Sequence, residues 1–125
     1  MPNRVSTAVV LANGVATTYW RCGSGRTVVL LGASDAIAIA LSASFRVIVP
    51  EVPFGFSDAG VVRWLGGVCE GLGIAEAAIV AVPALSDAAT RFAHDAPDRV
   101  KGVIITDSST ADVAELRAAV ERTFG

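Results

Sequence analysis

Two short runs of consecutive apolar residues constrain what this chain can fold into. They lie at Thr27–Leu31 and Ala77–Val82, and neither shows the alternation of a half-exposed strand. A strand of this kind has to be covered on both faces, which is typical of a parallel sheet between two layers of helices. The rest of the sequence is therefore interpreted as the elements that surround two central strands.

Turn and capping signals divide the remaining sequence into further elements. Asn13-Gly14 suits a tight turn and predicts a β-hairpin between Val5–Ala12 and Val15–Cys22. The other predicted strands are Phe45–Val49 and Val100–Thr106. Four helices are predicted. The first is Asp35–Ala43, and the second is capped by Asp58 and ends at Gly71 and Gly73. The third is Ala84–Asp95, and a closing helix has Val113, Leu116, Val120 and Phe124 on one face. Gly66 and Gly67 each cost the second helix about 1 kcal/mol relative to alanine, so tertiary packing has to hold it.

This order of elements predicts an α/β fold. We expect a three-layer α/β/α domain over residues 1–125, with a mostly parallel sheet of about six strands and an antiparallel N-terminal hairpin.

Composition excludes several classes of protein. The 125 residues are 53% hydrophobic, yet no apolar run approaches the roughly 20 residues of a membrane span, so we expect a cytoplasmic protein without a membrane partner. The net charge of −2 is scattered without a basic stripe, which argues against nucleic acid. Cys22, Cys69 and the single histidine do not form a ligand pattern, so we expect no metal and no cofactor, and two reduced thiols.

Four segments in order resemble the α/β-hydrolase family. The first combines residues 13–15, 23–25 and 28–31, the second is 45–53, the third is 72–80, and the fourth is 91–108. The resemblance implies that a nucleophile elbow of the form Gly-x-Ser-x-Gly follows the strand Ala77–Val82. It also implies that the catalytic acid and histidine of the family would come from strands beyond this sequence.

The residues that define the elbow motif are replaced in this chain. The corresponding residues are Ala81, Val82, Pro83, Ala84 and Leu85, with proline at the position of the nucleophile. Proline carries no hydroxyl, and its fixed φ near −65° does not suit the strained conformation of the elbow. We therefore expect no catalytic residue at this turn.

A crevice at the carboxyl ends of the strands is the candidate ligand site. Its predicted members are Gly32, Ala33, Glu51, Pro83, Ala84 and Asp107. Two strands are expected between Glu51 and Asp107, which argues against a carboxylate pair. His94 is expected to be solvent-exposed at a helix end, and Ser86 is expected to lie in a first helical turn, too far from His94 to form a dyad.

Three hypotheses about function follow. The first is a non-hydrolytic domain that serves binding, scaffolding or regulation. The second is a small enzyme or ligand-binding protein that uses the crevice for a small molecule. The third is a subunit completed by a separate chain. Because the strand at Val100–Thr106 would be a bare edge, we expect a homodimer through this edge or through helices packed across a two-fold axis.

Overall fold

Six strands form one mixed sheet in the computed structural model, which describes residues 6–32, 35–52, 55, 57–106 and 113–124. The strands are β1 (Ser6–Ala12), β2 (Val15–Cys22), β3 (Thr27–Leu31), β4 (Arg46–Pro50), β5 (Ala77–Ala81) and β6 (Val100–Ile105). Their order in the sheet is β1-β2-β4-β3-β5-β6. The pairs β1–β2 and β2–β4 are antiparallel, and the other pairs are parallel. The predicted fold class is confirmed.

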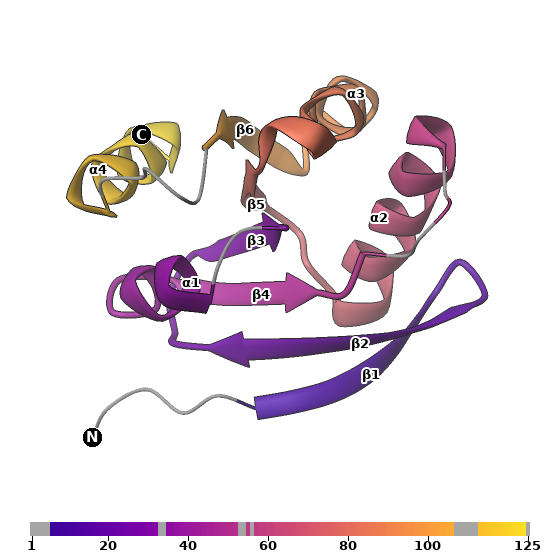
Figure 1. Cartoon of the computed structure of the whole chain (residues 1–125), viewed down its shortest axis with the longest axis horizontal. Helices are drawn as coiled ribbons and strands as arrows, with labels where there is room; N and C mark the ends of the chain where they lie inside the picture. The colour runs from indigo at the N-terminus through magenta and orange to yellow at the C-terminus, as the bar shows by residue number, and fades with distance from the viewer. Residues whose placement is uncertain (1–5, 33–34, 53–54, 56, 107–112, 125) are drawn as a thin grey trace.

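Helices cover both faces of this sheet (Figure 1). They are α1 (Asp35–Leu41), α2 (Asp58–Leu72), α3 (Ser86–Asp95) and α4 (Val113–Phe124), and a 3₁₀ turn, η1 (Pro83–Leu85), precedes α3. Helices α2 and α3 pack on one face, and α1 and α4 pack on the other. The sheet and these two layers of helices form the three layers of the domain.

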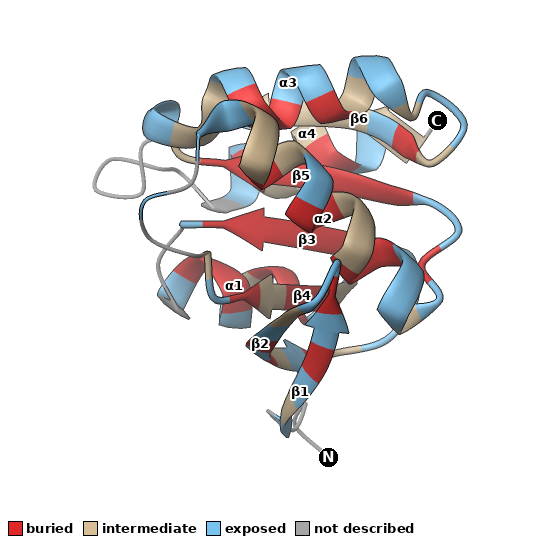
Figure 2. Cartoon of the chain, turned by 90° about the vertical axis from the view of Figure 1, so that its right-hand side faces the viewer, coloured by how far each residue is buried: buried red, intermediate tan, exposed pale blue. Residues whose placement is uncertain are grey.

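The central strands β3 and β5 supply both cores. Along β3, Val29 and Leu31 point into the core beneath α2 and α3, while Val28 and Leu30 point into the core beneath α1 and α4. All four side chains are fully buried, and Figure 2 shows β3 and β5 as the most continuously buried strands. The unbroken apolar runs in the sequence therefore have the double coverage that they predict.

Helix α4 lies on the face of the sheet opposite to the one that a connection from β6 to a further parallel strand would use. Helices α2 and α3 make the connections from β4 to β5 and from β5 to β6 on one face, as right-handed crossovers require. A parallel strand added outside β6 would be reached through that same face, but α4 packs on the opposite one. Helix α4 thus covers β5 and β6 and leaves the free side of β6 at the sheet edge.

Aromatic and cationic contacts hold the end of α4 against the amino ends of the strands. The Arg26 guanidinium donates a hydrogen bond from Nη1 to the carbonyl oxygen of Phe124 at 2.9 Å, and it lies 5.2 Å from the centre of the Phe124 ring. The Phe45 ring lies 6.1 Å from the same ring. The last helix of the chain therefore packs its Phe124 ring against Phe45 at this end of the sheet.

Several predicted boundaries differ from the structure by one or two residues, and three of them have a physical interest. Ser57, not Asp58, caps α2, because its side chain accepts a hydrogen bond from the Gly60 N–H at 3.2 Å and Asp58 is already helical. The strand predicted at 45–49 lies at 46–50. The helix predicted from Ala84 begins at Ser86, after the 3₁₀ turn, since proline suits the first position of such a turn.

The glycines of α2 explain how this helix approaches the hairpin. A methyl group at Gly67 would lie 2.7 Å from the carbonyl carbon of Ala12, and one at Gly71 would lie 2.5 Å from a methyl of Val10. A methyl group at Gly66 would lie 3.7 Å from the Phe92 ring, which is an ordinary contact. Gly67 and Gly71 thus let the helix pack directly against β1, whereas Gly66 has no such steric role.

Two neighbouring substitutions separate these roles. We expect Gly67→Ala to lower the free energy of unfolding by about 1–2 kcal/mol, because forced overlap with the backbone outweighs the gain in helix propensity. We expect Gly66→Ala to be neutral or to stabilise by up to about 1 kcal/mol. Urea unfolding followed by circular dichroism measures both values, and equal effects of the two variants would contradict the close packing at Gly67.

Candidate functional site

The turn after β5 occupies the position that the resemblance assigns to a nucleophile. Strand β5 ends at Ala81, Val82 is extended with φ −74° and ψ 159°, and Pro83 opens the 3₁₀ turn. The Val82 N–H donates to the Leu31 carbonyl at 3.1 Å, and the Leu85 N–H donates to the Val82 carbonyl at 2.9 Å. One backbone hydrogen bond therefore joins the start of the turn to the end of β3, the other closes the turn itself, and the exposed Pro83 presents no reactive group.

Aliphatic side chains pack against the residue that follows the carboxyl end of β3. Gly32 follows this strand with φ +79°, a conformation that L residues rarely adopt. A methyl group at Gly32 would lie 2.8 Å from Cγ2 of Val82 and 3.3 Å from Cδ1 of Leu85. The side chains of Val82 and Leu85 thus pack against Gly32, and a Cβ at this position would overlap Val82.

The predicted crevice residues are brought together only in part. Gly32, Pro83 and Ala84 lie at the carboxyl ends of β3 and β5, with Pro83 and Ala84 exposed. Glu51 follows β4, is exposed, and donates its backbone N–H to the Thr18 carbonyl at 2.9 Å on the hairpin side.

Two predicted members of the crevice, Ala33 and Asp107, lie outside the described residues. Strands β3 and β5 do separate β4 from β6, as expected. The carboxyl end of β4, where Glu51 lies, is therefore two strands away from the carboxyl end of β6.

The remaining reactive side chains that the structure describes do not come together at this turn. His94 is in the last turn of α3 with its side chain 90% exposed, and its Nδ1 lies 3.8 Å from a carboxylate oxygen of Asp95. Ser86 begins the same helix, so the two ends of α3 separate it from His94. Within the described ranges, no three His, Cys, Asp or Glu side chains could hold a metal ion together, and no helix there is long and apolar enough to cross a membrane.

Both cysteines are free and buried. Cys69 is on the buried side of α2, and this burial raises the pKa of its thiol to about 11, with the nearby Arg99 charge opposing the shift and Glu70 adding to it. Because the thiolate is the nucleophilic form, Cys69 is inert at neutral pH. Cys22 is 3% exposed at the end of β2.

Thiol labelling tests this assignment. We expect iodoacetamide at pH 8 to leave Cys69 unmodified in the native chain and to modify it fully in urea, because both burial and a pKa about 11 suppress the thiolate. Peptide mass spectrometry after a timed quench measures the modified fraction. Rapid native labelling of Cys69 at pH 8 would contradict its placement in the core.

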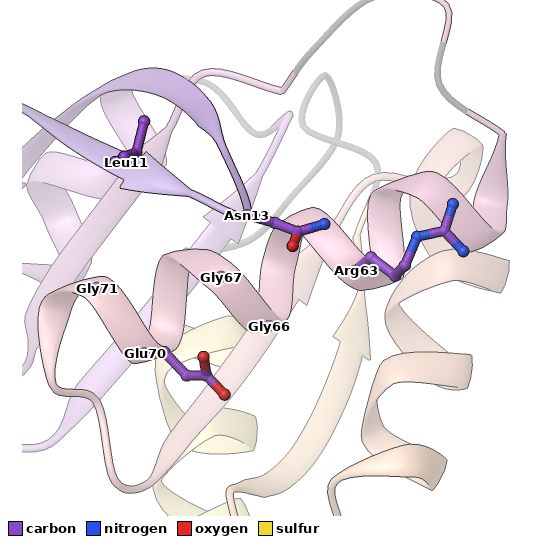
Figure 3. Close-up of a pocket in the computed structure, with 7 residues that line it drawn as sticks. All are labelled: Leu11, Asn13, Arg63, Gly66, Gly67, Glu70 and Gly71. Atoms are coloured by element: carbon purple, nitrogen blue, oxygen red, sulfur yellow. The ribbon is translucent and has the colours of Figure 1, made fainter.

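Polar hollows not anticipated from the sequence lie along α2. One of about 480 Å³ lies between the hairpin turn and the helix and includes Asn13, Arg63 and Glu70 (Figure 3). A second, of about 400 Å³, shares Asn13 and Arg63. Figure 3 shows the charged ends of Arg63 and Glu70 apart, on different turns of α2, so they do not converge on one ligand position. In the sequence, Asn13 signalled only a turn, and the helical glycines gave no sign of a groove.

Comparison with solved structures agrees with this architecture. An epoxide hydrolase, CorEH, superposes with a TM-score of 0.74 and 23% identity over 83% of this chain and 42% of its own. A meta-cleavage product hydrolase, CumD (A129V mutant), gives 0.70 and 28% identity over 77% of this chain and 43% of its own. The epoxide hydrolase VrEH1 from Vigna radiata gives 0.72 and 16% identity over 92% and 46%.

No protein-family model matches the sequence, and no curated protein matches it. The chain therefore has the α/β-hydrolase fold, shown by structure and not by sequence similarity. It spans less than half the length of the hydrolases that it matches.

Proposed function

We propose that this chain is a non-hydrolytic α/β-hydrolase-like domain that acts by binding, as a scaffolding or regulatory unit. The observation that carries the proposal is Pro83 in a 3₁₀ turn where the fold would hold a nucleophile. The solved structures with this fold include hydrolases of epoxides and of meta-cleavage products. Their chemistry needs groups that this turn does not supply.

Each requirement for hydrolysis by an elbow is unmet within the described residues. Position 83 has no nucleophilic atom, and its neighbours Val82 and Leu85 pack their aliphatic side chains against Gly32. His94 is in solvent at the far end of α3 and does not face the turn as a base would. A histidine supplied by further sequence or by another chain would still find no hydroxyl at Pro83.

Activity-based labelling tests the loss of hydrolysis. We expect no reaction of the purified chain with a fluorophosphonate probe, and hydrolysis of 4-nitrophenyl butyrate and styrene oxide at the rate of the heat-denatured sample. The Ser86→Ala variant is the matched control, because Ser86 is the serine nearest to Pro83 in the sequence. Labelling of the native chain that Ser86→Ala abolishes would overturn the proposal.

The scaffolding role that we propose is self-association through β6. This strand is at the edge of the sheet, and β5 pairs with only one of its sides. The Thr106 N–H points to β5, where it donates to the Ala81 carbonyl at 2.9 Å, so the N–H of Ile105 points outward by alternation. Ile105 is also 42% exposed, one of few large apolar side chains so exposed in the described chain. A second copy of β6 would satisfy the outward groups and cover this side chain.

Sedimentation equilibrium at micromolar concentration tests this pairing. We expect a dimer for the wild type and a folded monomer for Ile105→Pro, because proline removes an outward N–H without breaking the bonds to β5. Val9→Lys is the control at the other sheet edge, where Val9 is 66% exposed on β1, and it should remain dimeric. A monomeric wild type, or a dimer that survives Ile105→Pro, would contradict pairing through β6.

A further inference from the structure

Another hollow, separate from the two along α2, lies at the opposite end of the sheet from the candidate crevice. It has a volume of about 520 Å³ and lies where β3, β4 and β6 begin. Its lining includes Arg26, Arg46 and Lys101, which are far apart in the sequence, and a single carboxylate, that of Glu76. The fold thus gathers cations that the sequence shows only as scattered residues.

The three cations differ in how far their charges are already neutralised. Lys101 Nζ lies 2.6 Å from Glu76 Oε2, and this contact lowers the pKa of the Glu76 carboxyl, with a smaller contribution from Arg26. Arg26 forms no ion pair with the described residues, and its contacts there are with the neutral carbonyl and ring of Phe124. Arg46 is half-buried and has no ion pair or side-chain hydrogen bond to the described residues.

The hollow therefore carries two positive charges that its own lining does not neutralise. The chain as a whole has a net charge of −2, so this excess is local. A half-buried guanidinium without a partner is unfavourable unless an anion or water solvates it. The hollow thus has the charge of an anion site, and Glu76, the one carboxylate of its lining, is already paired with Lys101.

We propose that this hollow binds the phosphate group of a small molecule, held by Arg46 and Arg26. Guanidinium groups donate in a planar fork that matches phosphate oxygens, and such charge-assisted hydrogen bonds are stronger than neutral ones. A phosphate dianion would balance the two free charges and leave the Lys101–Glu76 pair intact. The volume exceeds that of the phosphate group alone, and Phe124 and Ile74 provide apolar lining for an attached organic group.

Nuclear magnetic resonance titration of the whole chain tests the site at constant ionic strength. The probes are inorganic phosphate and phenyl phosphate, and sodium sulfate and phenol are the controls for charge and for the ring. We expect saturable shifts of the backbone amides of residues 73–76 and of Arg46 with both phosphates. Phenyl phosphate should bind more tightly if the organic group contributes, whereas equal affinity would assign the site to free phosphate.

Variants then separate a site from general attraction. We expect Arg46→Gln to weaken phosphate binding about tenfold, as the loss of charge-assisted hydrogen bonds implies, and Arg46→Lys to weaken it less. Arg63→Gln is the matched control, because Arg63 lines a hollow of similar size along α2, and it should bind as the wild type does. Dispersed amide spectra confirm that each variant is folded.

Three results would overturn the proposal. The first is the absence of saturable shifts with either phosphate. The second is an equal effect of sulfate, which would show screening by any anion. The third is equal weakening by Arg46→Gln and Arg63→Gln. This proposal is independent of the loss of hydrolysis, since it concerns the other end of the strands.

Discussion

The burial of β3 and β5 on both faces is the constraint on which the rest of the structure depends. Every residue of these two strands is buried, so each face requires its own helical layer. Helices α2 and α3 supply one layer through right-handed connections. The other layer needs a partner for α1, which has only seven residues, and α4 provides it by packing over β5 and β6.

The same two strands determine what lies at their ends. At the carboxyl ends, where ligands usually bind in open α/β sheets, the described residues present aliphatic packing of Val82 and Leu85 on Gly32. At the amino ends, the chain places Arg26 and Arg46 beside a hollow. Among the described residues, the arginines that could bind a ligand thus lie at the amino ends of the strands, whereas the fold predicts a ligand site at the carboxyl ends. This placement supports the binding role that we propose.

Much of the fold could be predicted from the sequence because its signals are local. The apolar run of β3 indicates a strand that is buried on both faces, and the Asn13-Gly14 turn indicates a hairpin. The spacing of apolar residues in α2 indicates a helix and its buried side. The loss of the nucleophile at Pro83 is also local. The cap at Ser57 was missed because Asp58 next to it is an equally good capping residue type.

Features that depend on distant segments could not be predicted in this way. An amphipathic stripe gives α4 a buried side but does not say which face of the sheet it covers. Gly67 looks only unfavourable in a helix until β1 is placed against it. The cluster of Arg26, Arg46 and Lys101 joins three strand beginnings and has no sequence spacing of its own. Ala33 and Asp107 lie outside the described residues, so the part of the crevice that they were expected to form stays a prediction.

The packing at Gly32 tests the central claim most directly. In a methyl-labelled sample, the structure predicts strong nuclear Overhauser effects from the methyl groups of Val82 and Leu85 to the α protons of Gly32. Their presence would show that the turn at Pro83 is closed onto β3 in solution. If these nuclear Overhauser effects were absent and a soluble paramagnetic probe reached both methyl groups, the turn would not be packed on β3. That result would contradict this account.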